Sequence, residues 1–287
     1  MIDLTAEGAA APRDLGAFAR DLCARKESGR CDGVLYVVLA DGLYAMRMFN
    51  PDGSEAEMCG NGIRCVAKYV YDHKLTDKTE ISVETGAGIK YLTLYVEENK
   101  VSQVRVDMGE PILTPGDIPV VKADGSAYDD DYRVIDEPIS AGNREWHMTC
   151  VSMGNPHAVI FTEGIDELEL EKIGPLFENH KLFPNRINTE FVEVIDSHTL
   201  KMRVWERGSG ETFACGTGTC ATVVAAVLNG ICQKDEEVLV HLRGGDLRII
   251  WKNDETVLMT GPAEYVFEGN VSDEFIAKEK ENVVCRS

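Results

Sequence analysis

Two stretches of this sequence resemble each other, and together they indicate the fold. Residues 46–62 read MRMFNPDGSEAEMCGNG, and residues 202–218 read MRVWERGSGETFACGTG. Both begin with Met-Arg, continue through an aromatic residue and a Gly-Ser pair, and end in Cys-Gly-x-Gly. The match indicates a chain built from two copies of one structural unit.

The similarity extends outward from these stretches in the same order. RCDGVLYVV from Arg30 resembles RINTEFVEV from Arg186, and LGAFARDL from Leu15 resembles LEKIGPLF from Leu170. With 287 residues the chain can bury two cores of ordinary size. We therefore expect an N-terminal half, residues 1–115, and a C-terminal half, residues 116–287.

Each half combines strands with one long helix after its cysteine. Alternating β-branched and aromatic residues separated by turn residues favour strands in the first half. The expected strands are 34–39, 44–49, 79–83, 90–96 and 101–108. Helices are expected at 61–73 and at 217–229, the second with Gly230 as its C-cap. The predicted fold class is α/β (α+β): two pseudo-symmetric domains, each a mixed sheet wrapped around a central helix, with the active site between the halves.

The Pro-, Gly- and Asp-rich segment 114–131 is the expected linker.

The start of the chain leads to a second expectation. Residues 148–161, MTCVSMGNPHAVIF, indicate a strand, a Gly-Asn turn at Asn155 and another strand. The repeat places the counterpart of that turn upstream of Met1, and the opening MIDL resembles the second of the two strands. We therefore expect the natural protein to begin earlier than Met1.

Composition narrows the class of partners. The formal charge is -20, from 29 Lys and Arg against 49 Asp and Glu, which disfavours nucleic acid and anionic membranes. No apolar run is long enough to cross a bilayer, and the opening residues lack a signal-peptide pattern. We expect a cytoplasmic protein.

The nine cysteines include no Cys-x-x-Cys pair, so we expect reduced thiols rather than disulfides or a zinc ribbon. Most are expected to be small buried residues without a chemical role. These are Cys23, Cys31, Cys65, Cys150, Cys220, Cys232 and Cys285.

Cys59 and Cys215 stand directly before a Gly-x-Gly that opens a helix. Backbone N–H groups at a helix start bind carboxylates, and the same field lowers the pKa of a nearby thiol. Inverting a stereocentre requires a base on one face of the α-carbon and an acid on the other, which two thiols can supply. No nucleotide-binding glycine pattern or His-Glu-x-x-His motif is present, and neither a cofactor nor a metal is expected.

These two motifs, with their flanks MFNPDGSEAEMCGNGIRC and ERGSGETFACGTGTCA, resemble the diaminopimelate epimerase family over nearly the entire chain. The resemblance implies interconversion of L,L- and meso-diaminopimelate, in lysine and cell-wall precursor biosynthesis, with Cys59 and Cys215 as acid and base. It implies that His157 and Glu206 support the cysteines. It further implies substrate contacts from Asn50, Gly60, Asn61, Asn155, Asn188, Glu206, Arg207, Gly216 and Thr217.

Several alternatives stay open at this stage. Proline- and hydroxyproline-type racemases are similar, but they typically have histidine where Asn61 stands, and their substrates give Arg207 no distal carboxylate to bind. Phenazine-type isomerases lack the paired cysteines. An inactive carboxylate-binding module is a third reading, and a cysteine-nucleophile hydrolase would leave the second cysteine without a task. The expected partner is a small amino-acid substrate, and a homodimer is left open.

Overall fold

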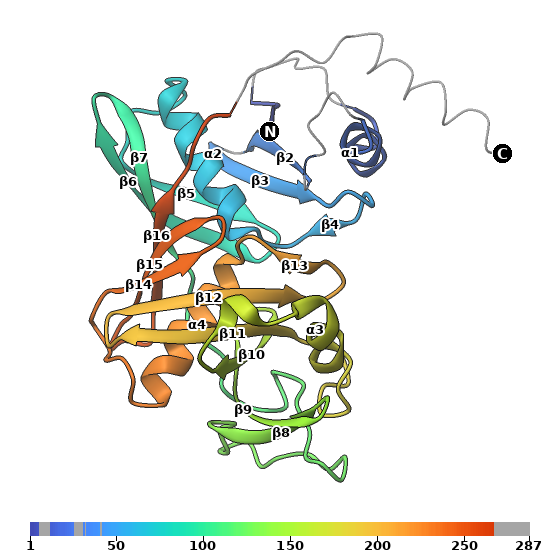
Figure 1. Cartoon of the computed structure of the whole chain (residues 1–287). Coiled ribbons are helices and arrows are strands. Elements are labelled where there is room, and N and C mark those ends of the chain that lie inside the picture. Colours follow the sequence, from blue (N-terminus) through green and yellow to red (C-terminus); the bar gives the residue numbers. More distant parts are fainter. Residues whose placement is uncertain (6–11, 26–30, 32, 41, 267–287) are drawn as a thin grey trace, which may run out of the picture. The chain divides into compact units, whose positions relative to one another are not determined.

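The computed structural model describes residues 1–5, 12–25, 31, 33–40 and 42–266 (Figure 1). These residues form two compact units. Unit 1 comprises the described residues of Met1–Val104 together with 262–266, and unit 2 comprises Arg105–Gly261. The chain therefore passes from one unit to the other twice.

Unit 1 is a mixed sheet with two helices. Its strands are β1 (Ile2–Asp3), β2 (Val34–Ala40), β3 (Leu43–Phe49), β4 (Glu55–Ala56), β5 (Glu80–Thr85), β6 (Gly88–Glu97) and β7 (Lys100–Asp107), and its helices are α1 (Leu15–Cys23) and α2 (Gly60–Asp72). The sheet order is β1-β2-β3-β5-β6-β7, with β4 paired to β3. β1 is parallel to β2 and β3 is parallel to β5, whereas β2–β3 and β5–β6 are antiparallel.

Unit 2 repeats this plan with two extra strands. Its elements are β8 (Glu137–Ala141), β9 (Arg144–Ser152), β10 (Pro156–Phe161), η1 (Ile165–Glu167), α3 (Leu170–Glu178), β11 (Asn188–Asp196), β12 (Thr199–Glu206), β13 (Gly210–Thr212), α4 (Gly216–Leu228), β14 (Val238–Leu242), β15 (Gly245–Trp251) and β16 (Val257–Pro262). The strand order is β16-β15-β14-β12-β11-β10-β9-β8, with β13 paired to β12.

The two units share one connectivity. β10 is parallel to β11 as β1 is to β2, β11–β12 is antiparallel as β2–β3 is, and β12 is parallel to β14 as β3 is to β5. The helices correspond as α1 to α3 and α2 to α4. The internal repeat of the sequence is thus a repeat of structure, and the opening MIDL does contain a strand that corresponds to the end of β10.

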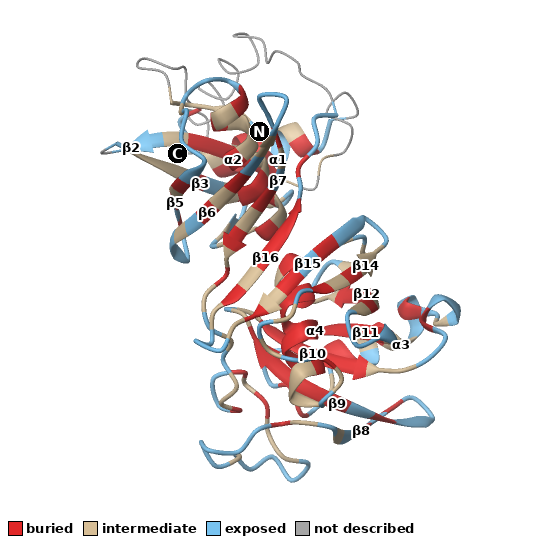
Figure 2. Ribbon diagram, turned by 90° about the vertical axis from the view of Figure 1, so that its left-hand side faces the viewer, coloured by how far each residue is buried: buried red, intermediate tan, exposed pale blue. Residues whose placement is uncertain are grey.

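The two helices that follow the cysteines differ in burial. α4 is apolar and buried on nearly all sides, and it packs against β9, β10, β11 and β15 (Figure 2). α2 packs against β3 and β6 and keeps a partly exposed side. Among the described residues, no helix is long and apolar enough to span a membrane.

The segment 114–131 is not the linker that its composition suggested. Ile118 and Val120 are buried in the main apolar cluster of unit 2, and the Val121 amide donates to the Leu182 carbonyl. The prolines and glycines of this segment therefore shape a loop that packs onto its own unit.

The core of unit 2 centres on three aromatic rings. Phe177 of α3 is fully buried and makes edge-to-face contacts with Trp146 and Phe191, at centroid distances of 5.7 and 5.4 Å. Such contacts add to the hydrophobic stabilisation from the buried ring area. Unit 1 has a smaller cluster, in which Phe18, Tyr36 and Phe49 are buried.

Phe177→Ala should lower the free energy of unfolding of unit 2 by about 3–5 kcal/mol, because the lost ring leaves a cavity in a packed core. All three tryptophans lie in unit 2, so denaturant unfolding followed by tryptophan fluorescence reports this unit. Leu176→Ala is the matched control: its side chain is 44% exposed, and the loss should be under about 1 kcal/mol. Equal losses in the two variants would contradict the assignment of the core.

Candidate active site

In unit 1 the candidate half-site is built at the start of α2. Cys59 is the N-cap residue, in an extended conformation (φ -139°, ψ 107°), and its Sγ accepts a hydrogen bond from the Gly62 amide at 3.3 Å. The helical hydrogen bonds begin with the Ile63 amide, which donates to the Cys59 carbonyl. A helix start gives the amides of its first two residues, here Gly60 and Asn61, no partner within the helix, so they are suited to bind an anion.

Unit 2 repeats this geometry at α4. Cys215 is the N-cap residue (φ -125°, ψ 111°), and its Sγ accepts from the Gly218 amide at 3.4 Å. The amides of Gly216 and Thr217 are placed like those of Gly60 and Asn61. Both helices begin one residue earlier than the sequence predicted, because a cysteine serves as the cap that Ser, Thr, Asp or Asn usually provides.

The segment before each cysteine is held by the hairpin turn of the same unit. In unit 1 the Ala87 amide, between β5 and β6, donates to the Glu57 carbonyl at 3.1 Å. In unit 2 the Gly244 amide, between β14 and β15, donates to the Phe213 carbonyl at 2.8 Å. Each thiol is therefore positioned by a sheet hairpin as well as by its helix.

The other expected residues of unit 1 lie at the same end of α2 or in the turn after β3. Asn61 Oδ1 accepts from Arg64 Nη2 at 3.1 Å, and Arg64, a buried residue, also donates to the Gly60 carbonyl at 3.0 Å. Asn50 closes the turn to β4 by donating from Nδ2 to Ser54 Oγ at 3.0 Å.

In unit 2, two expected ligand-binding residues are joined directly. The side-chain oxygen of Asn188, Oδ1, accepts a hydrogen bond from the Arg207 backbone amide at 2.8 Å. The Arg207 guanidinium donates to the backbone carbonyl of Asn185 at 3.1 Å. Asn188 opens β11, and Arg207 directly follows β12, its antiparallel neighbour. The strand pairing therefore brings these two residues together.

His157 and Asn155 form a second cluster in unit 2, together with a residue that sequence reasoning missed. His157 Nδ1 lies 2.7 Å from Glu190 Oε1, and His157 Nε2 lies 3.1 Å from Asn155 Oδ1. His157 and Glu190 are both fully buried. The available signal was a glutamate directly before Phe191 and Val192, in a segment where a buried strand residue is normally hydrophobic.

Glu206 and Cys215 perturb one another. Burial raises the pKa of the Glu206 carboxyl, although a hydrogen bond from Thr212 opposes this shift. Burial also raises the pKa of the Cys215 thiol well above its ordinary value, and the nearby carboxylates of Glu206 and Glu190 add to this effect. The helix start alone predicted a lowered pKa for this thiol; that prediction is wrong for Cys215, because burial outweighs the helix field.

The remaining cysteines have no visible role in these half-sites. Cys23, Cys150, Cys220 and Cys232 are buried, as expected, whereas Cys31 and Cys65 are only partly buried, and Cys285 lies outside the described residues. Among the described residues, no group of three or more His, Cys, Asp or Glu side chains is arranged to hold a metal ion.

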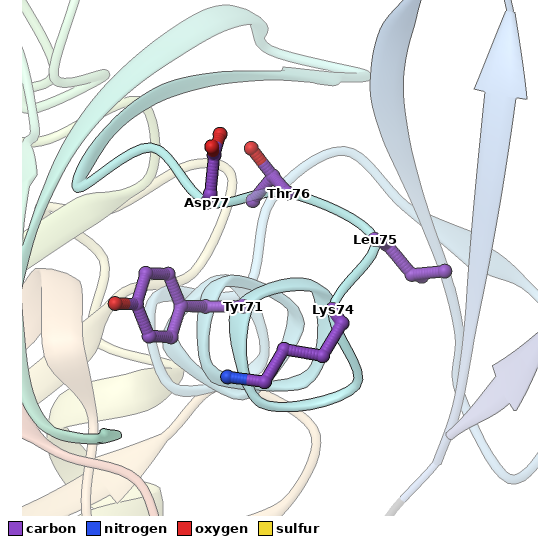
Figure 3. Close-up of a pocket in the computed structure, with 5 residues that line it drawn as sticks. All are labelled: Tyr71, Lys74, Leu75, Thr76 and Asp77. Carbon is purple, nitrogen blue, oxygen red and sulfur yellow. The ribbon is translucent and has the colours of Figure 1, made fainter. Parts of the chain in front are cut away.

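A surface hollow of about 360 Å³ lies at the other end of α2, lined by Tyr71, Lys74, Leu75, Thr76 and Asp77 (Figure 3). It contains no thiol or imidazole. Cys59 caps the opposite end of the helix. The hollow is therefore not part of the half-site.

Solved structures share this two-unit fold. A hydroxyproline epimerase from Agrobacterium vitis matches with a TM-score of 0.63 and 11% sequence identity, over 88% of this chain and 82% of that chain. A phenazine biosynthesis protein of the PhzF family from Bacillus anthracis matches with a TM-score of 0.62 and 17% identity, over 91% and 89% of the two chains. The fold defines a class of proteins that includes epimerases and phenazine biosynthesis proteins.

Sequence comparison selects one family within this class. The family model described as diaminopimelate epimerase matches residues 4–114 and 149–266. A diaminopimelate epimerase from Agathobacter rectalis is 74% identical over 242 residues, covering 84% of each chain. One from Methanococcus maripaludis is 52% identical over 262 residues, covering 91% of this chain and 90% of the other. The chain belongs to the diaminopimelate epimerase family and is an isomerase.

Alkylation tests the environment of Cys215. Because its pKa is raised, the iodoacetamide reaction rate at Cys215, followed by peptide mass spectrometry, should be low at neutral pH and should increase on the alkaline side. Glu206→Gln removes a negative charge beside the thiol and should move this increase to lower pH. Glu193→Gln, on β11, should leave the profile unchanged. An identical profile in the wild type and Glu206→Gln would contradict the electrostatic account.

Proposed function

We propose that this chain interconverts L,L- and meso-diaminopimelate by proton transfer between Cys59 and Cys215, without an organic cofactor. The observation that carries the proposal is the matched pair of cysteine caps, one in each unit, each beside two amides suited to a carboxylate. The identity to curated diaminopimelate epimerases supports the choice of substrate. We further propose that the two half-sites act on one substrate molecule.

The protonation states suggest how the reaction starts. Cys215, with its raised pKa, begins as the thiol and serves as the acid. Cys59 then serves as the base: its thiolate takes the α-proton, and Cys215 donates its proton to the opposite face of the same carbon. The turnover ends with Cys59 as thiol and Cys215 as thiolate, and the reverse reaction uses the opposite assignment.

The backbone amides at the helix starts would hold the reacting carboxylate. Gly60 and Asn61 in unit 1, and Gly216 and Thr217 in unit 2, offer donors that also stabilise the negative charge that develops at the α-carbon and its carboxylate. This stabilisation is the task that an electron-withdrawing cofactor performs in other enzymes.

The asparagine orientations fit a second, distal carboxylate. The side-chain oxygens of Asn155 and Asn188 already accept hydrogen bonds within unit 2. Their side-chain NH2 groups are therefore the donors that a ligand can use. Together with the Arg207 guanidinium they form a donor set that suits a carboxylate. Glu206 is the acceptor available for an ammonium group. A substrate with two carboxylates matches this pattern better than proline does.

Two further features belong to the proposal. We propose a cytoplasmic location, because the chain has many thiols and a diaminopimelate-type substrate is made inside the cell. Homodimer formation stays a prediction, and no step of the mechanism above depends on it.

Cys59→Ala and Cys215→Ala should each lower the rate of conversion of L,L- to meso-diaminopimelate at least about a hundredfold, because each removes one of the two proton carriers. Chiral chromatography of timed samples measures the conversion. Cys65→Ala is the matched control, since this cysteine lies in α2 beyond the helix start, and it should retain activity. Full activity in either catalytic variant would overturn the two-thiol mechanism.

Arg207→Gln should raise KM for L,L-diaminopimelate about tenfold or more, with a smaller effect on kcat, because the guanidinium contacts the distal carboxylate rather than the reacting carbon. Initial rates over a range of substrate concentrations separate the two constants. Arg248→Gln, a control on β15 that removes an exposed ion pair with Glu237, should leave both constants unchanged. An unchanged KM in Arg207→Gln would argue against a dicarboxylate substrate.

A further inference from the structure

Glu190 is a fully buried carboxylate whose part in the mechanism above is limited to raising the pKa of Cys215. It lies on β11, its Oε1 is 2.7 Å from His157 Nδ1, and its Oε2 has no hydrogen-bond partner among the described residues. Burial of a carboxylate is costly unless a partner compensates its charge. A residue kept at such a position is expected to contribute more than packing.

Unit 1 shows that packing does not require a carboxylate at this place. A Cβ built on Gly218 would lie 2.5 Å from Glu190 Oε1, and a Cβ built on Gly62 would lie 2.8 Å from Leu35 Cδ2. Each side chain therefore packs directly against the glycine that donates to the cysteine cap. In unit 1 an ordinary leucine fills the space.

The strand registers establish that Leu35 and Glu190 are equivalent. Leu35 pairs with Met48 of β3, and Glu190 pairs with Val204 of β12. Met48 and Val204 both directly follow the Met-Arg that opens the repeated motif. Alignment of the sequences alone places Val34 opposite Glu190, so the structure shifts this part of the repeat by one residue.

His157 links Glu190 to Asn155. Its Nε2 lies 3.1 Å from Asn155 Oδ1, and because a carbonyl oxygen only accepts, Nε2 carries a proton and donates it. The 2.7 Å contact between Nδ1 and the Glu190 carboxyl oxygen requires a second proton between them. The hydrogen bond between His157 and Glu190 therefore offsets part of the cost of burying the carboxylate.

We propose that Glu190 is a positioning residue that acts on the substrate through His157 and Asn155. It fixes the imidazole ring, the ring holds the Asn155 carbonyl oxygen, and the Asn155 amide N–H group is thereby presented as a donor. The inference rests on the proposed function, in which that donor contacts the distal carboxylate. Glu190 itself does not touch the substrate.

Steady-state kinetics of the whole chain with L,L-diaminopimelate test this series of contacts. Glu190→Leu, which copies unit 1, should lower kcat/KM about tenfold, mainly through a higher KM, since the lost contact is remote from the reacting carbon. Glu190→Gln should stay within about threefold of the wild type, because its amide can donate to Nδ1 and leave the Nε2 donor on Asn155. Glu193→Gln, on the same strand, controls for loss of charge and should retain wild-type constants.

A double-mutant cycle separates positioning from a merely structural role. If Glu190 acts through Asn155, then adding Glu190→Leu to Asn155→Ala should change kcat/KM by less than about twofold. The proposal is overturned if Glu190→Leu retains wild-type constants, if it causes the same loss with and without Asn155, or if Glu190→Gln is as impaired as Glu190→Leu. Denaturant unfolding followed by tryptophan fluorescence confirms that each variant is folded.

Proton NMR with nitrogen-15 labelling gives a readout that does not depend on turnover. The wild type and Glu193→Gln should show a strongly downfield proton bonded to His157 Nδ1, and Glu190→Leu should lack it. A wild type without this resonance overturns the inference. A wild type that shows the resonance but does not convert diaminopimelate overturns the proposed function and leaves the Glu190–His157 contact supported.

Discussion

A hydrogen bond from a glycine amide to a cysteine sulfur, made once at the start of α2 and once at the start of α4, is the constraint on which both half-sites depend. The bond uses the third amide of the helix and leaves the first two for a ligand. It also explains the second glycine of each motif: a Cβ at Gly62 or Gly218 would lie 3.2 or 3.3 Å from the cysteine sulfur and closer still to the side chain beneath it. The motif Cys-Gly-x-Gly therefore specifies one backbone geometry, a helix start capped by a cysteine sulfur.

Duplication of that geometry did not duplicate its environment. The half-site of unit 2 contains Glu206, Glu190 and His157, and burial among these groups keeps the Cys215 thiol protonated. The half-site of unit 1 has a leucine in place of Glu190 and a buried arginine, Arg64, on the first turn of the helix. In the proposed mechanism this difference sets which thiol holds the proton when the L,L substrate binds.

The sequence predicted much of the fold because a repeat doubles every local signal. The expected helices and the expected strands of the first half appear within about two residues of their predicted ends, which is the usual uncertainty of helix and strand boundaries. The helix starts were misplaced by one residue because cysteine is not a common N-cap. The linker prediction failed because Pro, Gly and Asp report turns but do not report whether the residues between them, such as Ile118, are buried.

The site was less predictable where burial decides the chemistry. A helix start suggested a lowered pKa for both thiols, but sequence carries no measure of how deeply Cys215 is covered, and burial reverses the direction there. Glu190 was missed for a related reason: the sequence repeat pairs it with Val34, and only the registers of β2 with β3 and of β11 with β12 pair it with Leu35.

The proposed mechanism assigns two different thiols to the two faces of one α-carbon. This assignment can be tested by converting L,L-diaminopimelate in deuterium oxide and taking samples early in the reaction. The two isomers are separated, and the deuterium content of each is measured by mass spectrometry. With two bases, the proton removed by one cysteine is not the one delivered by the other, so deuterium should enter the meso product while recovered L,L substrate stays unlabelled. Equal labelling of both isomers from the first samples would indicate a single base that returns solvent protons to either face, and would contradict the account.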